Sequence, residues 1–160
     1  HDIVDLFIAQ LGREPLGTPR DPDICRRDPE NPQLGGCDAQ NKRYKQTTIV
    51  TSPPGLVLTL LRFAWSERLR RPVKLHTTVN FNAGFPPIQG AGQYDLRAVV
   101  QHRGDHPTSS STNSGHYTAY VRASDAEWYH CDDAKPPRRC ENGIADVLQA
   151  QAYMLFYEQR

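Results

Sequence analysis

Several features that would place this sequence in a special class of protein are absent from it. No apolar run approaches the ~20 residues that a membrane-spanning helix needs, so we expect no membrane partner. The 19 Lys and Arg residues almost balance the 18 Asp and Glu residues, and this balance gives no electrostatic reason to expect a nucleic-acid partner. The chain starts at His1, with neither Met nor a basic and apolar signal peptide, so we expect a fragment or a processed piece.

Cysteine is also scarce. Cys25, Cys37, Cys131 and Cys140 are too few for a disulfide scaffold in 160 residues, which predicts a reduced, intracellular protein. The spacing of Cys131 and Cys140 alone leaves a disulfide between them open. A structural zinc site takes four ligands, and the early pair offers two, with eleven residues between them. We therefore expect no bound metal and no cofactor, unless a segment outside this chain lends ligands.

The composition predicts one folded domain of the α+β class. A compact chain of this length should bury roughly 68–70% of its unfolded surface, which is enough for a core. The segment from Pro15 to Gln40 holds five prolines and three glycines, which is typical of a loop. From Tyr44 onward β-prone residues dominate, so we expect a mostly antiparallel sheet with few helices.

The pattern of apolar residues predicts individual elements. We expect a helix over 2–11, with Asp2 as its N-cap and Gly12 just beyond its end, and a short helix over 144–150. The expected strands are 44–50, 56–63, 73–75, 77–81, 94–102, 116–122, 127–132 and 152–157.

Two of these strands carry further expectations. The almost unbroken apolar run of 56–63 predicts a strand buried on both faces, whereas 94–102 alternates cleanly, with the even-numbered residues 94–100 on one apolar face. The polar stretch after it predicts a loop over 103–114, and we expect His102 and His106 to be solvated rather than a chelating pair.

The hairpin of 116–122 and 127–132 brings a histidine and a carboxylate together. A three-residue loop, 123–125, would pair Arg122 with Ala126, and the same register places His116 opposite Asp132. Their Cβ atoms would then lie roughly 4.5–5.5 Å apart, close enough for a hydrogen bond between the side chains. A carboxylate can fix the tautomer of an imidazole for base chemistry. Such pairs also occur for stability alone, so the register by itself leaves both roles open.

Three segments in this region carry a resemblance to a known family. NSGHYTAYVR (113–122), WYHCDD (128–133) and AYMLFY (152–157) resemble the C-terminal histidine box of ubiquitin-specific proteases. These papain-like cysteine proteases remove ubiquitin. GLVLTLLRF (55–63) and YDLRAVV (94–100) are similar to strands that precede the box, and the match runs in order from about 42 to 158.

The resemblance implies a fold, a reaction and partners. The chain would be the C-terminal portion of one catalytic domain, with a fingers-like segment over about 1–50 and a palm over about 51–160. The reaction would be thiol-dependent hydrolysis of the isopeptide bond at the C-terminal glycine of ubiquitin. Ubiquitin or ubiquitinated proteins would be the partners, in the cytoplasm and/or the nucleus.

The resemblance also implies catalytic roles. His116 would be the general base that activates a cysteine thiol, and Asp132 would orient it. Asp133 matches an acidic position that supports the site in some members of the family.

Substrate-binding roles follow from the same motif. Gly115 and Tyr117 would line the narrow channel for the Gly-Gly tail of ubiquitin, and Ser114 would bind substrate beside them. The loop 103–114 would lie over that tail.

The family's nucleophile has no match in these residues. Cys37 follows two glycines, but Asp38–Lys42 does not continue as the helix that the cysteine box opens. Cys131 is expected to pack on the face opposite Asp132. We therefore expect a separate thumb segment, carrying the catalytic cysteine, to complete the site, and an inactive chain without it. A non-catalytic ubiquitin-binding module and a structural zinc or scaffold domain are the alternatives.

Overall fold

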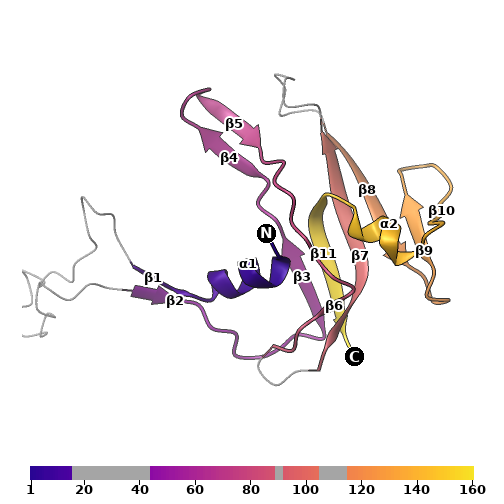
Figure 1. The fold of residues 1–160 in the computed structure, drawn as a ribbon, viewed down its shortest axis with the longest axis horizontal. Helices are drawn as coiled ribbons and strands as arrows, with labels where there is room; N and C mark the ends of the chain where they lie inside the picture. Colours follow the sequence, from indigo (N-terminus) through magenta and orange to yellow (C-terminus); the bar gives the residue numbers. More distant parts are fainter. Residues whose placement is uncertain (16–43, 89–91, 105–114) are drawn as a thin grey trace, which may run out of the picture. The chain divides into compact units, whose positions relative to one another are not determined.

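The computed structural model describes residues 1–15, 44–88, 92–104 and 115–160 (Figure 1). The chain forms two compact units, one of residues 1–5 with 50–160 and one of residues 6–49. Cys25, Cys37, His106, Ser114 and most of the predicted loops at 15–40 and 103–114 lie outside the described residues.

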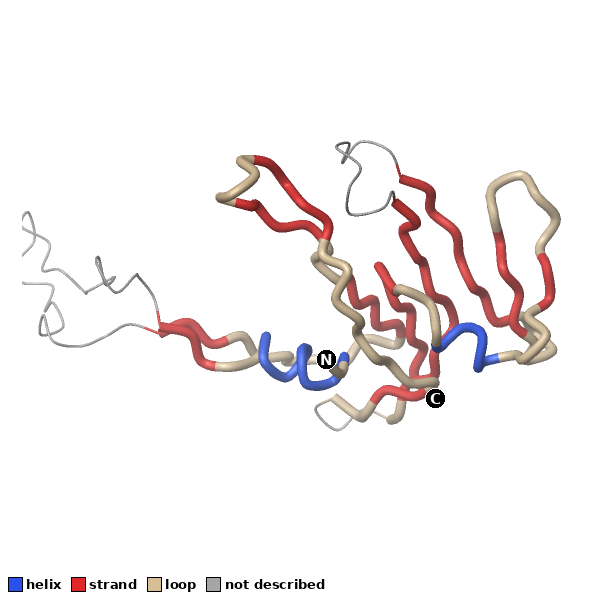
Figure 2. Tube along the Cα trace, turned by 45° about the horizontal axis from the view of Figure 1, so that its top comes forward, coloured by secondary structure: helices blue, strands red, loops and turns tan. Residues whose placement is uncertain are grey.

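A seven-stranded sheet organises the larger unit. Its strands run in the order β10-β9-β8-β7-β11-β3, with β6 also paired to β7, and every pairing is antiparallel. Figure 2 shows these strands side by side. They are β3 (Gly55–Thr59), β6 (Gly84–Phe85), β7 (Tyr94–Gly104), β8 (Gly115–Arg122), β9 (Trp128–Cys131), β10 (Arg138–Arg139) and β11 (Ala152–Gln159). The predicted mostly antiparallel α+β fold is confirmed.

Smaller elements complete the larger unit. The hairpin of β4 (Phe63–Ser66) and β5 (Arg71–Lys74) forms a two-stranded sheet of its own, and α2 (Ile144–Leu148) precedes β11. Residues 77–81 form no strand, in contrast to the prediction, and contribute only one isolated bridge, between Asn80 and Asp2. Neither described helix is long and apolar enough to cross a membrane.

The bounds of the first helix lie within one residue of the predicted 2–11. In α1 (Ile3–Gln10) the backbone N–H of Val4 donates to Asp2 Oδ1 at 2.8 Å, which is an N-cap bond. Gly12 donates to the carbonyl of Ala9 at 3.1 Å, and a Cβ at Gly12 would lie 2.9 Å from that oxygen.

The smaller unit contains a short ladder. There β1 (Arg13–Pro15) pairs with β2 (Tyr44–Gln46), which is shorter than the predicted strand over 44–50.

The core of the sheet forms where β7 meets β11. Tyr94 and Leu96 are buried as predicted, but burial then passes to Val99 and Gln101. The cause is a register shift: Tyr157 faces Leu96 and Phe156 faces Ala98, which leaves one extra residue on β7. A bulge of this kind moves the following side chains to the other face, so the clean alternation predicted over 94–102 is wrong beyond Leu96.

The predicted strand over 56–63 is neither as long nor as buried as expected. It ends at Thr59, and while Leu56 is buried, Val57 is 50% and Leu61 87% exposed. Burial alternates along β3, so only one face of this strand is covered. The chain then turns through the buried Arg62, whose guanidinium donates to the carbonyls of Ala152 and Thr77.

Candidate active site

The hairpin that carries the candidate catalytic residues closes on a three-residue loop. Ala123 N donates to Glu127 O at 2.8 Å, and Ala126 takes a left-handed φ of 68° just before the second strand. The predicted loop length is therefore confirmed, but the loop begins one residue later than predicted. As a result Arg122 pairs with Trp128 rather than with Ala126.

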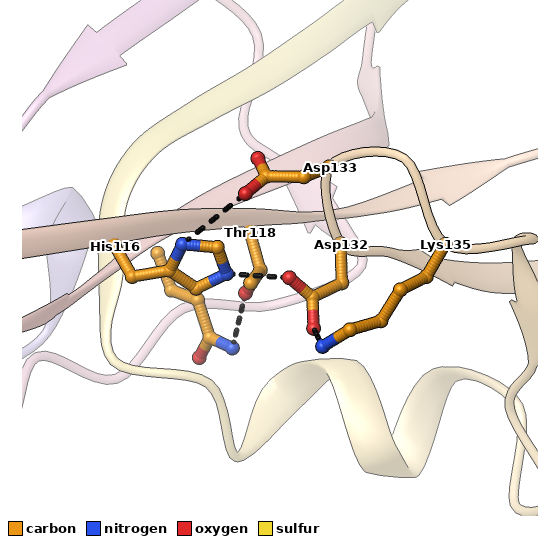
Figure 3. A network of polar contacts seen from close by, with 6 residues as sticks. His116, Thr118, Asp132, Asp133 and Lys135 are labelled. Atoms are coloured by element: carbon orange, nitrogen blue, oxygen red, sulfur yellow. Dashed lines mark hydrogen bonds and ion pairs between the residues drawn. The ribbon is translucent and has the colours of Figure 1, made fainter.

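With the observed register of β8 and β9, His116 and Asp132 still lie on one face of the sheet. A shift of two in the pairing preserves the alternation of side chains, so Asp132 still faces the same side as His116. Asp132 follows the last residue of β9 and approaches His116 from a diagonal position, and His116 Nε2 contacts Asp132 Oδ1 (Figure 3). The predicted contact between the two side chains is confirmed, although they are not directly opposite each other.

A tight turn gathers the charged groups around this contact. Lys135 N donates to Asp132 O at 3.0 Å, with Asp133 at a φ of 48° inside the turn. The same turn brings Lys135 Nζ to 2.6 Å from Asp132 Oδ2 and Asp133 Oδ2 to 3.5 Å from His116 Nδ1 (Figure 3). Each ring nitrogen of His116 therefore has a carboxylate beside it.

Electrostatics keep the first of these carboxylates ionised. Hydrogen bonds from Lys135, and next from His116, lower the pKa of Asp132 from 3.8 to about 2. Asp132 is also the less exposed of the two carboxylates, at 21% against 74% for Asp133. Asp132 is thus a charged acceptor across the neutral pH range.

Thr118 lies two residues after His116 on the same face of β8 and belongs to a buried polar pair. Gln101 Nε2 on β7 donates to Thr118 Oγ1 at 2.8 Å, and both residues are buried. This bond joins the two strands two residues from His116 and so limits the movement of β8 at the site.

The residues predicted to bind substrate are not all brought together with His116. Gly115 and Tyr117 flank His116 on β8, so the side chain of Tyr117 lies on the opposite face of the strand. There its ring packs against His102, with centroids 4.6 Å apart, and against Tyr153 at 5.7 Å. A role for Gly115 and Tyr117 beside His116 would have to come from their main-chain atoms.

The expectation that His102 is solvated is wrong. Its relative exposure is 9%, and its ring lies among aromatic side chains. The burial of His102 comes from aromatic neighbours on other parts of the chain, Phe63, Tyr117 and Tyr153, which no pattern around residue 102 indicates.

The site offers few groups for a cation. His116, Asp132 and Asp133 each place one potential ligand atom within 4.8 Å of the others. The ammonium group of Lys135 already occupies the free oxygen of Asp132, so its charge opposes a metal ion at this position. Three ligand atoms are also one short of the tetrahedral set that structural zinc takes.

The two described cysteines do not have the surroundings of a nucleophile. Both are free, and Cys140 is buried, which raises the pKa of its thiol and disfavours the thiolate. Cys131 is half-buried on β9 and pairs with Ala119, whose side chain lies on the face of β8 opposite His116.

Comparisons with known proteins find a matching family model and several relatives. The family model described as ubiquitin carboxyl-terminal hydrolase matches residues 23–157. Bovine ubiquitin carboxyl-terminal hydrolase 22 is 28% identical over 148 residues, covering 80% of this chain and 27% of the relative. Ubiquitin carboxyl-terminal hydrolase 44-B of Xenopus laevis is 35% identical over 140 residues, covering 80% of this chain and 19% of the relative. The chain thus spans about a quarter or less of the length of these relatives.

Solved structures share the fold over almost the whole chain. A structure of the yeast SAGA DUBm with an Sgf73 mutant has a TM-score of 0.73 and 26% identity, covering 99% of this chain and 34% of that one. The SAGA Ubp8/Sgf11/Sus1/Sgf73 DUB module bound to ubiquitin aldehyde has a TM-score of 0.74 and covers 99% of this chain and 33% of that one. At 23% identity, the second likeness shows the fold alone.

Proposed function

This chain belongs to the ubiquitin carboxyl-terminal hydrolase family, and from that premise we propose that it supplies the histidine and aspartate half of a deubiquitinase active site. The substrate is an isopeptide bond at the C-terminal glycine of ubiquitin. The observation that carries the proposal is the contact of His116 with an Asp132 carboxylate that is held ionised by Lys135.

In this mechanism the two nitrogens of His116 have different tasks. Asp132 accepts a hydrogen bond from Nε2–H and so fixes the tautomer in which Nδ1 carries a lone pair. Nδ1 takes the proton of a cysteine thiol, and the thiolate attacks the carbonyl carbon of the terminal glycine. The imidazolium then returns the proton to the leaving amine. Asp133, at 3.5 Å from Nδ1, stabilises the positive charge that the ring carries between these steps.

The nucleophile comes from outside these 160 residues in this proposal. Neither described cysteine has the surroundings of a reactive thiol, and the sequence around Cys25 and Cys37 lacks the family's cysteine box. A thumb segment would bring the cysteine and the oxyanion-stabilising groups to His116, so this chain alone is inactive. Its partners are that segment and ubiquitin or ubiquitinated proteins, in the cytoplasm and/or the nucleus.

The two halves of the chain have different tasks in this proposal. Residues of about 1–50 form a fingers-like segment, and those of about 51–160 form the palm that carries the histidine box. The separation of residues 6–49 from residues 1–5 and 50–160 as compact units supports this division.

A non-catalytic ubiquitin-binding or scaffold module is the second candidate. The missing cysteine box favours it, because the same surfaces could bind ubiquitin without any acyl transfer. If the complete protein binds ubiquitin but does not cleave conjugates at the C-terminus of ubiquitin, it is a non-catalytic module.

The proposal is tested by replacing the base in the complete enzyme. His116→Ala should lower turnover of a fluorogenic ubiquitin C-terminal amide at least about 100-fold, because a general base contributes that much or more. Ubiquitin binding, measured by calorimetry, should be largely retained. Asp132→Asn should lose as much or less, since it misorients the base without removing it. His76→Ala, at an exposed histidine, is the matched control. Full turnover by the His116 variant would exclude His116 as the base.

A further inference from the structure

We propose that His102 is a positioning residue for His116, acting through the main chain of Gly115. This inference deepens the proposed function, because it names a residue outside the histidine box that sets the geometry of the proposed base. His102 lies on β7 and Gly115 is the first residue of β8, so the two come from neighbouring strands of the sheet (Figure 1).

The imidazole of His102 fills the space that a side chain at residue 115 would need. A Cβ built on Gly115 would overlap His102 Nε2 and would lie 2.6 Å from Cε1 and 2.8 Å from Cδ2. These atoms belong to a ring rather than to the end of a flexible chain. The absence of a side chain at Gly115 is therefore what lets the ring lie against the strand.

The ring is held in this place from several sides. It contacts Phe63, Tyr117 and Tyr153, with centroids 5.9, 4.6 and 6.3 Å away. Lys74 Nζ donates to the main-chain carbonyl of His102 at 2.6 Å. Phe63 and Lys74 are cross-strand partners in the β4–β5 hairpin, so one small element fixes both the ring and its main chain.

The contact reaches His116 through the strand register. His102 pairs with Tyr117, Arg103 with His116, and Gly104 with Gly115. The ring thus reaches diagonally across the ladder to Gly115, on the face of β8 opposite the side chain of His116. The ring of His102 therefore packs against Gly115, the first residue of β8, and the next residue is His116, whose side chain contacts Asp132.

Shape rather than proton transfer explains this role. Burial, and next the charge of Lys74, lower the pKa of His102, which favours the neutral ring. Nδ1 is buried and has no hydrogen-bond partner within the part of the chain that the structure describes. We therefore attribute the effect of His102 on Gly115 to the volume of its neutral ring and not to a hydrogen bond from Nδ1.

A size exchange between the two residues tests the inference in the complete enzyme. Gly115→Ala should lower kcat about 100-fold with little change in KM, because a displacement of the main chain near 1 Å is enough for such a loss. The double variant Gly115→Ala with His102→Ala should have a kcat at least about tenfold higher than that of Gly115→Ala. The reason is that removal of the ring frees the space for the new methyl group, and substitutions at contacting residues are not additive. His102→Ala alone should lower kcat without raising KM. Gly84→Ala, in β6 beside β7, is the matched control, because its Cβ would lie an ordinary 3.6 Å from Tyr94 O.

Thermal unfolding and NMR of the His116 ring test the contact independently of turnover. Thermal unfolding shows whether Gly115→Ala folds, and an unfolding temperature restored in the double variant would support the contact even if the single variant is unstable. The ¹H–¹³C signals of the His116 ring should move in Gly115→Ala and return toward the wild type in the double variant. This readout supports or overturns the inference even if the wild-type protein shows no turnover and the proposed function fails. The inference is overturned by a double variant no better than Gly115→Ala in kcat, or by His116 signals that do not respond to either substitution.

Discussion

Arg62 is predicted to stabilise the larger unit through the hydrogen bonds of its buried guanidinium. Its side chain is 6% exposed, and Nε and Nη2 donate to the carbonyl of Ala152 at 3.0 and 2.8 Å, while Nη1 donates to that of Thr77. These bonds join the start of β11 to the segment that follows β5. Arg62→Met keeps most of the stem but removes all of them.

The size of the effect follows from these contacts. A hydrogen bond from a charged donor contributes about 1.5–3 kcal/mol, and two carbonyls would lose such a donor. Burial lowers the pKa of Arg62, so the wild type carries a desolvation penalty that Met removes, which offsets part of the loss. We therefore expect the free energy of unfolding to fall by about 3 kcal/mol. At ~2–4 °C per kcal/mol for a domain of this size, the unfolding temperature should fall by about 6–12 °C.

Denaturant unfolding followed by the fluorescence of the buried Trp128 measures this change. Arg97→Met is the matched control, because Arg97 is 46% exposed and its ion pair with Glu158, at 2.6 Å, lies at the surface. That variant should lose about 1 kcal/mol or less. A loss below about 1 kcal/mol for Arg62→Met, or equal losses for both variants, would refute the reasoning from buried carbonyls.

Two further predictions concern the candidate site and its hairpin. Lys135→Ala should raise the pKa of Asp132 from about 2 toward 3.8, as measured by ¹³C titration of the carboxyl carbon, and an unchanged midpoint would contradict the assigned cause. The ionised Asp132 contributes fully to stability above pH 3.8, and this contribution is lost as the pH falls toward 2. Ala126→Gly should raise the free energy of unfolding by about 0.5–1 kcal/mol because Ala126 has a φ of 68°, whereas Ala145→Gly in α2 should lower it. Thermal unfolding compares the two, and a fall in both would show that Ala126 is not strained.

Local chemistry made part of this structure predictable. The cap at Asp2, the glycine after α1 and the alternation of β8 depend on neighbouring residues, and each could be read from the sequence. The contact of His116 with Asp132 was predictable for a more robust reason. A loop that begins one residue later changes the pairing by two, which leaves both side chains on the same face.

Features that depend on distant residues could not be predicted. The bulge in β7 arises from its register with β11, and Val57 is exposed because only one face of β3 is covered. The contact of His102 with Gly115 requires the register of β7 with β8, which no local pattern specifies.

Labelling with a ubiquitin C-terminal electrophile tests most directly whether this chain supplies the base but not the nucleophile. The purified 160-residue chain and the complete enzyme are treated side by side, and adducts are located by peptide mapping. We expect no adduct on the chain alone, and on the complete enzyme an adduct at a cysteine outside these residues that is lost in the variant lacking that cysteine. An adduct on Cys25, Cys37, Cys131 or Cys140 would contradict the account and make that cysteine the nucleophile.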